Sequence, residues 1–371
     1  MKKYALVIPI YRSYIDEVEK FNLNNNVHKL GKYHICLALP KTLNLSWHLE
    51  HDCLTIVRFD DVFFQGYQGY SRLLMSEQFY RTFAEYEKIL ICQLDAYIFE
   101  DRMEYFCALP YDYIGAPAFL HFFEDGSCEV RPGNGGFSLR DVHNTLQLLK
   151  HHVQERDMWK DTEDAFFSFC AMKYPHEFRM PSAAVAASFA FDRFVSVMFD
   201  WNRRQVPFGI HAWSTYAPEF VCRFLTERQK RSLNHVLKGC TSEEILSPFH
   251  AFLSRSSTVL LYGAGDWGRV IGRALQILQV NIGCFVVSDG HVKPGEEIFG
   301  IPVRYLSEIM PLDAGTGVIL SMSQRYLTVE ERDDLHQTIV KKGVEEILDV
   351  DNRLFNFIAE IVLREKGRRF L

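Results

Sequence analysis

A short polar motif interrupts an apolar stretch in the first third of the chain. The run Ile89–Cys92 is continuously apolar, Gln93-Leu94-Asp95 follows it, and a second apolar run starts at Ala96. Continuous hydrophobicity predicts a buried strand. A buried Asp without a partner is costly, so we expect Asp95 at the carboxyl end of that strand, facing the crevice where open α/β sheets bind ligands. The alternative is a turn Asp that caps the next segment.

Three further polar groups follow in order. They are a loop containing Gly133, Asn134, Gly135 and Gly136, the pair Glu163-Asp164, and His211. The set suits sugar transfer from a nucleoside diphosphate, whose leaving group gains negative charge that a divalent cation stabilises. Asp95 and His211 are suitable ligands for such a cation, and the glycines let the backbone approach a bulky ligand.

Transfer also needs a base that deprotonates the attacking hydroxyl, and Asp164 is the candidate. Each group has a plainer alternative: the glycine loop as a turn, the Glu-Asp pair as a helix start with Thr162 or Asp164 as cap, and His211 as a hydrogen-bonded core residue. The order and spacing of the set weigh more than any member.

The surrounding elements predict how these groups are positioned. Strands alternating with helices indicate a mainly parallel sheet covered on both faces. Before the Gln93-Asp95 motif we expect strands at 4–10, 33–39 and 54–59 and helices at 13–30 and 70–86; after it, a strand at 113–117 and helices at 142–151 and around 165–169.

Composition and charge narrow the classes of function that the chain could have. The chain has 371 residues, is 48% hydrophobic and carries a net charge of −6, which gives no indication of nucleic-acid binding. No apolar run approaches the length of a bilayer span, and the N-terminus reads as a first strand rather than a signal peptide. Nine scattered cysteines without a C-x-x-C pair predict reduced thiols, no structural zinc and a cytoplasmic protein.

The ordered motifs resemble a family. The strings Phe64–Arg72, Gln93–Tyr97 and Gly133–Arg140, with Glu163-Asp164 and His211, are similar to GT-A glycosyltransferases and to the poorly characterised, glycosyltransferase-like group DUF5672. The resemblance covers roughly residues 1–215. It implies an α/β fold with a GT-A, Rossmann-like domain, and an enzyme that transfers a sugar from a nucleotide donor.

The resemblance also implies roles. Asp95 and His211 would bind Mn²⁺ or Mg²⁺ or the diphosphate, and Asp164, with Glu163, would be catalytic in an inverting reaction. Asn134, Gly135 and Gly136 would contact donor or acceptor. Gln93 replaces an Asp common in this family and could bind ribose or base, while Tyr70 and Arg72 could contact nucleotide or phosphate. We favour a UDP-sugar donor and a glycan or lipid-linked glycan acceptor, in bacterial surface-polysaccharide synthesis.

A second α/β pattern begins near residue 255. Gly263-x-Gly265-x-x-Gly268 follows a predicted strand, and Asp289 ends the next one, as in dinucleotide-binding folds. The segment resembles the N-terminal domain of PglD-type sugar acetyltransferases, which implies a bound nucleotide sugar; NAD is the alternative. The predicted organisation is a GT-A domain at 1–217, a helical connector at 218–254 and a Rossmann-like domain at 255–371.

Two alternatives to the transferase stay open: a nucleotide-sugar-binding protein without catalysis, and an NAD-dependent oxidoreductase acting through the C-terminal domain. The tail, from Leu354 to Arg369, reads either as a docked helix or as a basic amphipathic helix touching the inner face of a membrane. A homo-oligomer is also compatible with the sequence.

Overall fold

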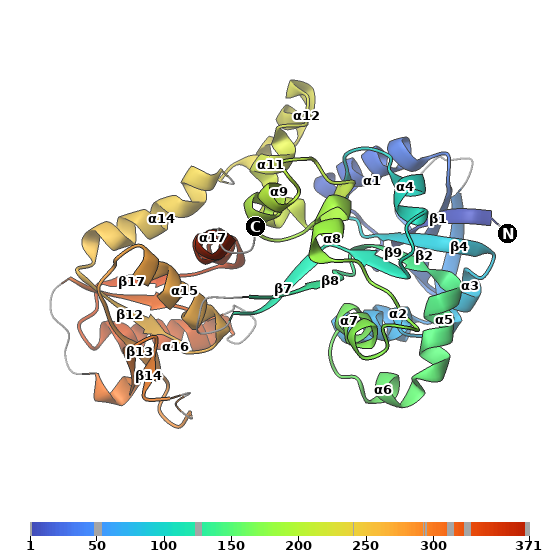
Figure 1. Ribbon diagram of the computed structural model, residues 1–371. Helices are drawn as coiled ribbons and strands as arrows, with labels where there is room; N and C mark the ends of the chain where they lie inside the picture. The colour runs from blue at the N-terminus through green and yellow to red at the C-terminus, as the bar shows by residue number, and fades with distance from the viewer. Residues whose placement is uncertain are drawn as a thin grey trace. The chain divides into compact units, whose positions relative to one another are not determined.

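The chain forms two compact units (Figure 1). The computed structural model describes residues 2–47, 54–122, 128–239, 241–291, 293, 295–309, 315–322 and 328–367. Unit 1 comprises Met1–Ala118 and Val130–Leu233, and unit 2 comprises Phe119–Glu129 and Asn234–Leu371. The three-part division at residues 217 and 254 stays a prediction.

Unit 1 contains a six-stranded sheet in which the first four strands are parallel. Strands β9 and β6 extend it, with β9 antiparallel to both neighbours. The strands in spatial order are β3 (Leu54–Phe59), β2 (His34–Pro40), β1 (Lys2–Pro9), β4 (Tyr86–Cys92), β9 (Phe137–Asp141) and β6 (Tyr113–Gly115). The prediction of a mainly parallel α/β sheet is confirmed.

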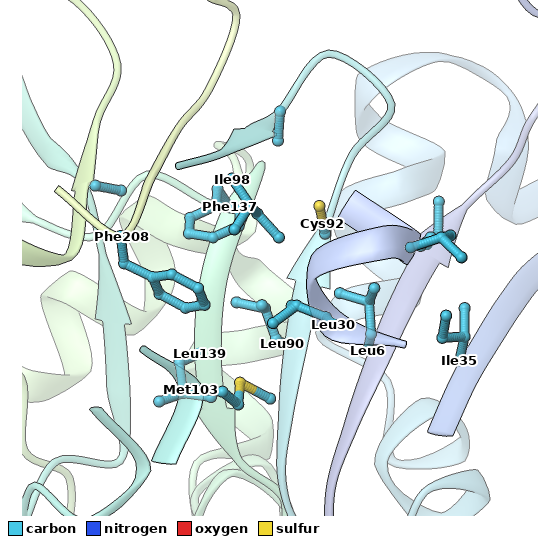
Figure 2. Close-up of a cluster of buried hydrophobic side chains, with 14 of the residues drawn as sticks. Leu6, Leu30, Ile35, Leu90, Cys92, Ile98, Met103, Phe137, Leu139 and Phe208 are labelled. Atoms are coloured by element: carbon cyan, nitrogen blue, oxygen red, sulfur yellow. The ribbon is translucent and has the colours of Figure 1, made fainter. Parts of the chain in front are cut away.

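Apolar side chains cover both faces of this sheet. On one face, helices α1 (Glu17–Leu30) and α4 (Met103–Cys107) pack against β1 and β4, where Leu30, Leu6 and Leu90 are buried together (Figure 2). The opposite face is covered by α2 (Gly66–Leu74), α3 (Glu77–Thr82), α5 (Val142–His151) and α7 (Glu163–Lys173). Burial on both faces explains why β4 reads as one continuous apolar run.

The single helix predicted at 70–86 is wrong. The chain forms α2, breaks at Met75-Ser76 and restarts as α3, because the Ser76 hydroxyl accepts the backbone N–H of Phe79 and caps the second helix. The residues after Thr82 leave the helix, and β4 already begins at Tyr86.

A small second sheet joins three distant segments of unit 1. Strand β11 (Gly209–Ile210) lies between β10 (Ala190–Phe191), which is parallel to it, and β5 (Tyr97–Ile98), which is antiparallel. The polar residues that flank these strands are therefore brought together. Asp95 precedes β5, Asp192 follows β10 and His211 follows β11.

The remaining elements are short and mostly helical. A two-stranded sheet pairs β7 with β8. The elements are η1 (Asp61–Phe64), β7 (Pro117–Phe122), β8 (Cys128–Pro132), α6 (Val153–Met158), α8 (Ala183–Phe189), α9 (Val195–Trp201), α10 (Trp213–Tyr216), α11 (Pro218–Cys222), α12 (Glu227–Ser232) and α13 (Asn234–Leu237).

Unit 2 contains its own six-stranded sheet, which is parallel except for one edge strand. Its strands in spatial order are β14 (Glu297–Ile298), β15 (Ile301–Tyr305), β13 (Ile282–Val287), β12 (Thr258–Tyr262), β16 (Thr316–Leu320) and β17 (Glu346–Asp349). Its helices are α14 (Ser242–Arg255), α15 (Asp266–Ile277), η2 (Leu306–Glu308), α16 (Val329–Val340) and α17 (Asn352–Gly367). The predicted second α/β pattern is present.

The last helix, α17, is docked within unit 2. Leu354, Phe355 and Ile358 are buried, and the Phe355 ring stacks on Trp267 of α15 at 4.1 Å. Its apolar face is thus covered by protein, as in the docked alternative, and membrane contact stays a prediction; residues 368–371 lie outside the described residues. No helix in the described part of the chain is long and apolar enough to cross a bilayer.

The cysteines of the described residues are all free thiols. Most of them are buried, whereas Cys53 and Cys240 lie outside the described residues.

Candidate functional site

The Gln93-Asp95 motif lies at the carboxyl end of β4, in a turn between β4 and β5. A pocket of about 370 Å³ opens there. Its lining residues come from the ends of β1 and β4 and from α1, η1 and α2: Pro9, Tyr11, Glu19, Phe64, Gly66, Tyr67, Tyr70, Gln93, Leu94 and Asp95. Asp95 thus lies where ligands bind in open α/β sheets.

The Asp95 carboxylate has an unsatisfied oxygen. Its side chain is 40% exposed, but Oδ1 is buried and has no hydrogen bond of good geometry among the described residues. The nearest cationic group is His211, with Nε2 3.2 Å from Oδ1. Burial alone would raise the pKa of Asp95, but the charge and proximity of His211, together with a backbone hydrogen bond, lower it below its ordinary value.

His211 lies between two carboxylates. Its Nδ1 is 3.0 Å from Asp192 Oδ1, and its Nε2 is 3.1 Å from Gln93 Oε1 as well as close to Asp95. Burial opposes the charged imidazole, yet the Asp95 charge and the Asp192 hydrogen bond raise the pKa of His211 well above its ordinary value. A cationic His211 can therefore face any anion that enters beside Asp95.

Asp192 was missing from the sequence-based candidates. It is 8% exposed, follows the two-residue strand β10, and belongs to no motif that would have marked it. Nearby, Phe194 and Ala212 both adopt left-handed backbone conformations, with φ of 53° and 48°. Such strain beside a polar cluster is typical of functional sites.

A closed ring of hydrogen bonds joins five residues of the site. Asn134 Nδ2 donates to Asp192 Oδ2 at 3.3 Å, and the Gly136 N–H donates to Asn134 Oδ1 at 3.0 Å. The Gln93 N–H donates to the Gly136 carbonyl at 2.9 Å, and His211 closes the ring between Gln93 and Asp192. The ring fixes the glycine loop, the end of β4 and the imidazole relative to one another.

Gly135 and Gly136 are each required to be glycine by a different neighbouring side chain. A Cβ on Gly136 would overlap the His211 imidazole, and a Cβ on Gly135 would overlap the Glu163 carboxylate. The loop therefore passes between the histidine on one side and the start of α7 on the other. Only glycine permits this close approach on both sides.

Asp164 lies against the same loop. Its Oδ2 accepts the Gly135 N–H at 3.2 Å, and its Oδ1 accepts the Thr162 hydroxyl and the Ala165 N–H. These three bonds leave one of the roughly four lone-pair sites of a carboxylate unused. Asp164 is half-buried and does not line the pocket around Asp95.

Glu163 is built into a buried network. It is 5% exposed, pairs with the fully buried Arg140 at 3.1 Å, and accepts the Ser71 hydroxyl at 3.2 Å. Arg140 also donates to Tyr80 and Ser138. Burial and then the Asp164 charge raise the pKa of Glu163 above its ordinary value, against the opposing effect of Arg140. The geometry gives Glu163 a supporting role behind the loop, and its catalytic role stays a prediction.

Tyr70 and Arg72 of α2 lie apart from each other. Tyr70 lines the pocket, with its hydroxyl buried and without a good hydrogen bond among the described residues, and burial raises its pKa. Arg72 is exposed and is not among the residues lining the pocket. Of the two predicted contacts, Tyr70 is therefore the one placed beside Gln93.

The donor atoms beside Asp95 fit a divalent cation. Around His211 Nε2, Gln93 Oε1 and Asp95 Oδ1 lie at 3.1 and 3.2 Å. Neighbouring ligands of a cation bound at about 2.1–2.2 Å lie roughly 3.0 Å apart in an octahedron. Among the described residues no three His, Cys, Asp or Glu side chains form a metal-binding group, so a cation bound here would need the amide oxygen of Gln93 as its third donor.

In unit 2 the structure agrees with the predicted glycine turn but gives the predicted acid a protein partner. Gly263 has a φ of 111°, a Cβ on Gly268 would overlap the Gly263 carbonyl, and Gly265 faces open space. Asp289 accepts both the backbone N–H and the hydroxyl of Ser307, so each of its oxygens has a partner in η2. The predicted strand, glycine turn and helix are present, whereas the predicted ribose-binding acid is engaged with the protein; nucleotide binding by unit 2 stays a prediction.

Comparison with family models matches one family, described as "Protein of unknown function (DUF5672)", over residues 53–211, less than half of the chain. That span contains Gln93, Asp95, Asn134, Asp164 and His211. No curated protein matches.

Three glycosyltransferases are among the similar solved structures. The galactosyltransferase LgtC, in complex with donor and acceptor sugar analogues, has a TM-score of 0.38 at 10% identity, covering 62% of this chain and 99% of its own. A glycosyltransferase involved in glycosylation of the major capsid of PBCV-1 has 0.34 at 13%, covering 63% and 98%. GlyE of Streptococcus pneumoniae TIGR4 has 0.36 at 11%, covering 99% of both chains. Scores this low do not establish the activity of the present chain.

Proposed function

We propose that unit 1 is a glycosyltransferase of the GT-A type that moves a sugar from a nucleoside-diphosphate donor to a hydroxyl of a glycan acceptor. The observation that carries the proposal is that Gln93 and Asp95 line one pocket at the carboxyl end of the sheet and that His211 Nε2 lies within 3.2 Å of both side chains. The motif resemblance supplies the reaction class. The proposed setting is bacterial surface-polysaccharide synthesis at the cytoplasmic side of the membrane.

In the proposed reaction, an acceptor hydroxyl attacks the anomeric carbon of the donor sugar. The bond from that carbon to the diphosphate breaks, and the nucleoside diphosphate leaves with the bonding electrons. Asp164 takes the hydroxyl proton through the lone-pair site that its hydrogen bonds leave unused. A single base of this kind predicts inversion at the anomeric carbon.

Asp95, Gln93 and His211 would hold Mn²⁺ or Mg²⁺ in place of the His211 Nε2 proton, and the ion would supply positive charge to the departing diphosphate. The hydrogen-bonded ring keeps two of these donors, Gln93 and His211, in place before the substrate enters. Such preorganised charge is usually the largest contribution to catalysis. The pocket volume of about 370 Å³ is within the range of small-molecule sites.

The first experiment is calorimetric titration of UDP, GDP, CMP and NAD, with and without Mn²⁺. The proteins are the wild type, Asp95→Asn, and Asp289→Asn as the matched control in unit 2. We expect metal-dependent binding of one nucleoside diphosphate, UDP being favoured, that Asp95→Asn weakens about 100-fold or more and Asp289→Asn leaves unchanged. Binding that ignores both the metal and Asp95 would refute the site.

A nucleotide-sugar-binding protein without catalysis is the second candidate. Gln93 favours it, because an amide brings no charge to the cation site. Metal-dependent donor binding with no turnover across a panel of saccharide acceptors, and no donor hydrolysis, would select this candidate. Binding of NAD alone would instead assign the function to unit 2, as a nucleotide-binding domain or an oxidoreductase.

A further inference from the structure

Helix α1 carries four asparagines, and the side chains of two of them, Asn22 and Asn26, are buried. Asn22 is fully buried and Asn26 is 2% exposed, although asparagine is usually a surface residue. Burying an amide is costly unless its donor and acceptor are both paired. The partners of these side chains are all in unit 1, and those outside α1 lie on the segments that carry the candidate site.

Asn22 bridges two of these segments. Its Nδ2 donates to the carbonyl of Leu94 at 2.9 Å, and its Oδ1 accepts the indole N–H of Trp213 at 2.9 Å. Leu94 is the residue before Asp95, and Trp213 lies two residues after His211. One side chain therefore connects the turn that carries Asp95 to the segment that carries His211.

Asn26 lies one helical turn further on, and its partners outside α1 all lie on the Asp95 segment. Its Nδ2 donates to the Ala96 carbonyl at 2.8 Å, and its Oδ1 accepts the Ile98 N–H at 2.9 Å. Asn26 also donates to Cys92 Sγ at 3.4 Å and accepts from Asn25 Nδ2 at 3.1 Å, so it makes four hydrogen bonds where Asn22 makes two. Only Asn22 reaches the His211 segment.

The helix is a firm support for such a bridge. Asp16 and Glu19 form a reciprocal capping box at its start, and Leu23, Val27 and Leu30 anchor it in the core. The partner Trp213 is itself fully buried, with its ring at 6.3 Å from that of Tyr97. Neither end of the bridge can move without disturbing packed side chains.

We propose that Asn22 is a positioning residue that sets the separation of Asp95 and His211. The inference rests on the proposed function for its effect on donor binding, but the bridge itself is testable without any ligand. Asn22 acts through Leu94 and Trp213 and touches no reacting atom. A small displacement of one segment against the other would spoil a donor set whose members lie only 3.2 Å apart.

The matched variants are Asn22→Leu, which loses two hydrogen bonds, and Asn26→Leu, which loses four, none of them to the His211 segment. Hydrogen exchange of the ligand-free proteins is measured first, in peptides covering 92–98 and 209–216. We expect Asn22→Leu to speed exchange in both segments and Asn26→Leu to speed it in 92–98 only. Unchanged exchange at 209–216 in Asn22→Leu would overturn the proposal, whether or not the protein binds a nucleotide.

Donor binding is measured second, with UDP and Mn²⁺ as the probe. Asn22→Leu should lower the affinity about tenfold or more, as loss of outer partners of metal ligands does, and Asn26→Leu less than about threefold. Equal losses in the two variants would also overturn the proposal. If the wild type binds no nucleoside diphosphate, the proposed function fails, and the exchange data alone decide on Asn22.

A double variant separates positioning from stability. Asn22→Leu leaves the Trp213 indole N–H without its partner, and adding Trp213→Phe removes that orphaned donor. We expect the double variant to regain part of the lost thermal stability while its donor affinity stays low. Recovery of affinity together with stability would show a structural role only and overturn the proposal.

Discussion

Asp95 in unit 1 and Asp289 in unit 2 each follow a buried strand of a mainly parallel sheet, and each has a glycine-rich turn in its unit. Their carboxylates differ in whether the oxygens have hydrogen-bond partners in the protein. Asp95 keeps Oδ1 without a good hydrogen bond among the described residues, beside a pocket. Asp289 directs both oxygens to Ser307 of η2.

The difference shows what a motif can and cannot specify. Glycine spacing predicts a backbone path, and both turns have the path expected of them. The capacity to bind a ligand depends on whether polar atoms near that path remain without protein partners. On this criterion Asp95 Oδ1 in unit 1 is open to a ligand, whereas each oxygen of Asp289 in unit 2 already has a protein partner.

The largest effect should follow from Asp164→Asn. We expect the rate of sugar transfer to fall about 10³-fold, because the base is lost, with donor affinity within about twofold of wild type. Single-turnover assays with the donor identified by calorimetry measure this. The neighbour control Glu163→Gln should instead destabilise the fold by about 3–5 kcal/mol, since it leaves Arg140 buried without its counter-charge. Full activity in Asp164→Asn would remove the catalytic assignment from unit 1.

Gly136→Ala tests whether the glycine turn of unit 1, but not that of unit 2, is needed for transfer. Its Cβ would overlap the His211 ring, so the imidazole must move, and we expect turnover to fall about 10²-fold. The matched change in unit 2 is Gly265→Ala, whose Cβ meets no atom within 4 Å. That variant should keep wild-type stability and transfer activity. A loss of transfer in Gly265→Ala would contradict the division of roles between the units.

Asp192→Asn tests the carboxylate that the sequence did not reveal. The amide keeps the shape but loses the charge that orients His211 and stabilises its proton at Nδ1. We expect the apparent affinity for Mn²⁺ and donor to fall about 10- to 100-fold. Calorimetry measures the affinity, and the thermal midpoint provides the stability control. An unchanged affinity would mean that His211 needs no second carboxylate.

The smallest effect is the pH dependence of stability. The pKa of Asp95 is lowered from 3.8, so its contribution is present above about pH 4 and is lost as the pH falls through the folded pKa. The pKa of His211 is raised from 6.5, so its contribution is complete below about pH 6.5 and is lost as the pH rises through the folded pKa.

His211→Gln should therefore cost about 1–2 kcal/mol of unfolding free energy between pH 4 and 6.5, and less at alkaline pH. Urea unfolding of both proteins across this range measures the difference. A constant difference at every pH would show that the imidazole is held by packing rather than by charge. Asp289→Asn in unit 2, measured in the same assay, is the control variant.

The sequence by itself determined the local part of this structure. The continuous apolar run before Gln93 predicts β4, and the polar motif after it predicts the turn at the sheet edge. Glycine spacing predicts both glycine turns, since steric limits on φ and on close approach act within a few residues. Local signals failed where they were weak, as at Ser76, whose cap divides one periodic apolar pattern into two helices.

The tertiary structure decided which polar atoms meet. Asp192 reaches His211 only because a three-stranded sheet joins segments far apart in sequence, and Asn22 meets Trp213 across 191 positions. Ser307 captures Asp289 in the same way, from another segment of unit 2. Hydrogen bonds of side chains depend on distances of a few tenths of an ångström, and residue type and spacing along the chain do not determine such distances.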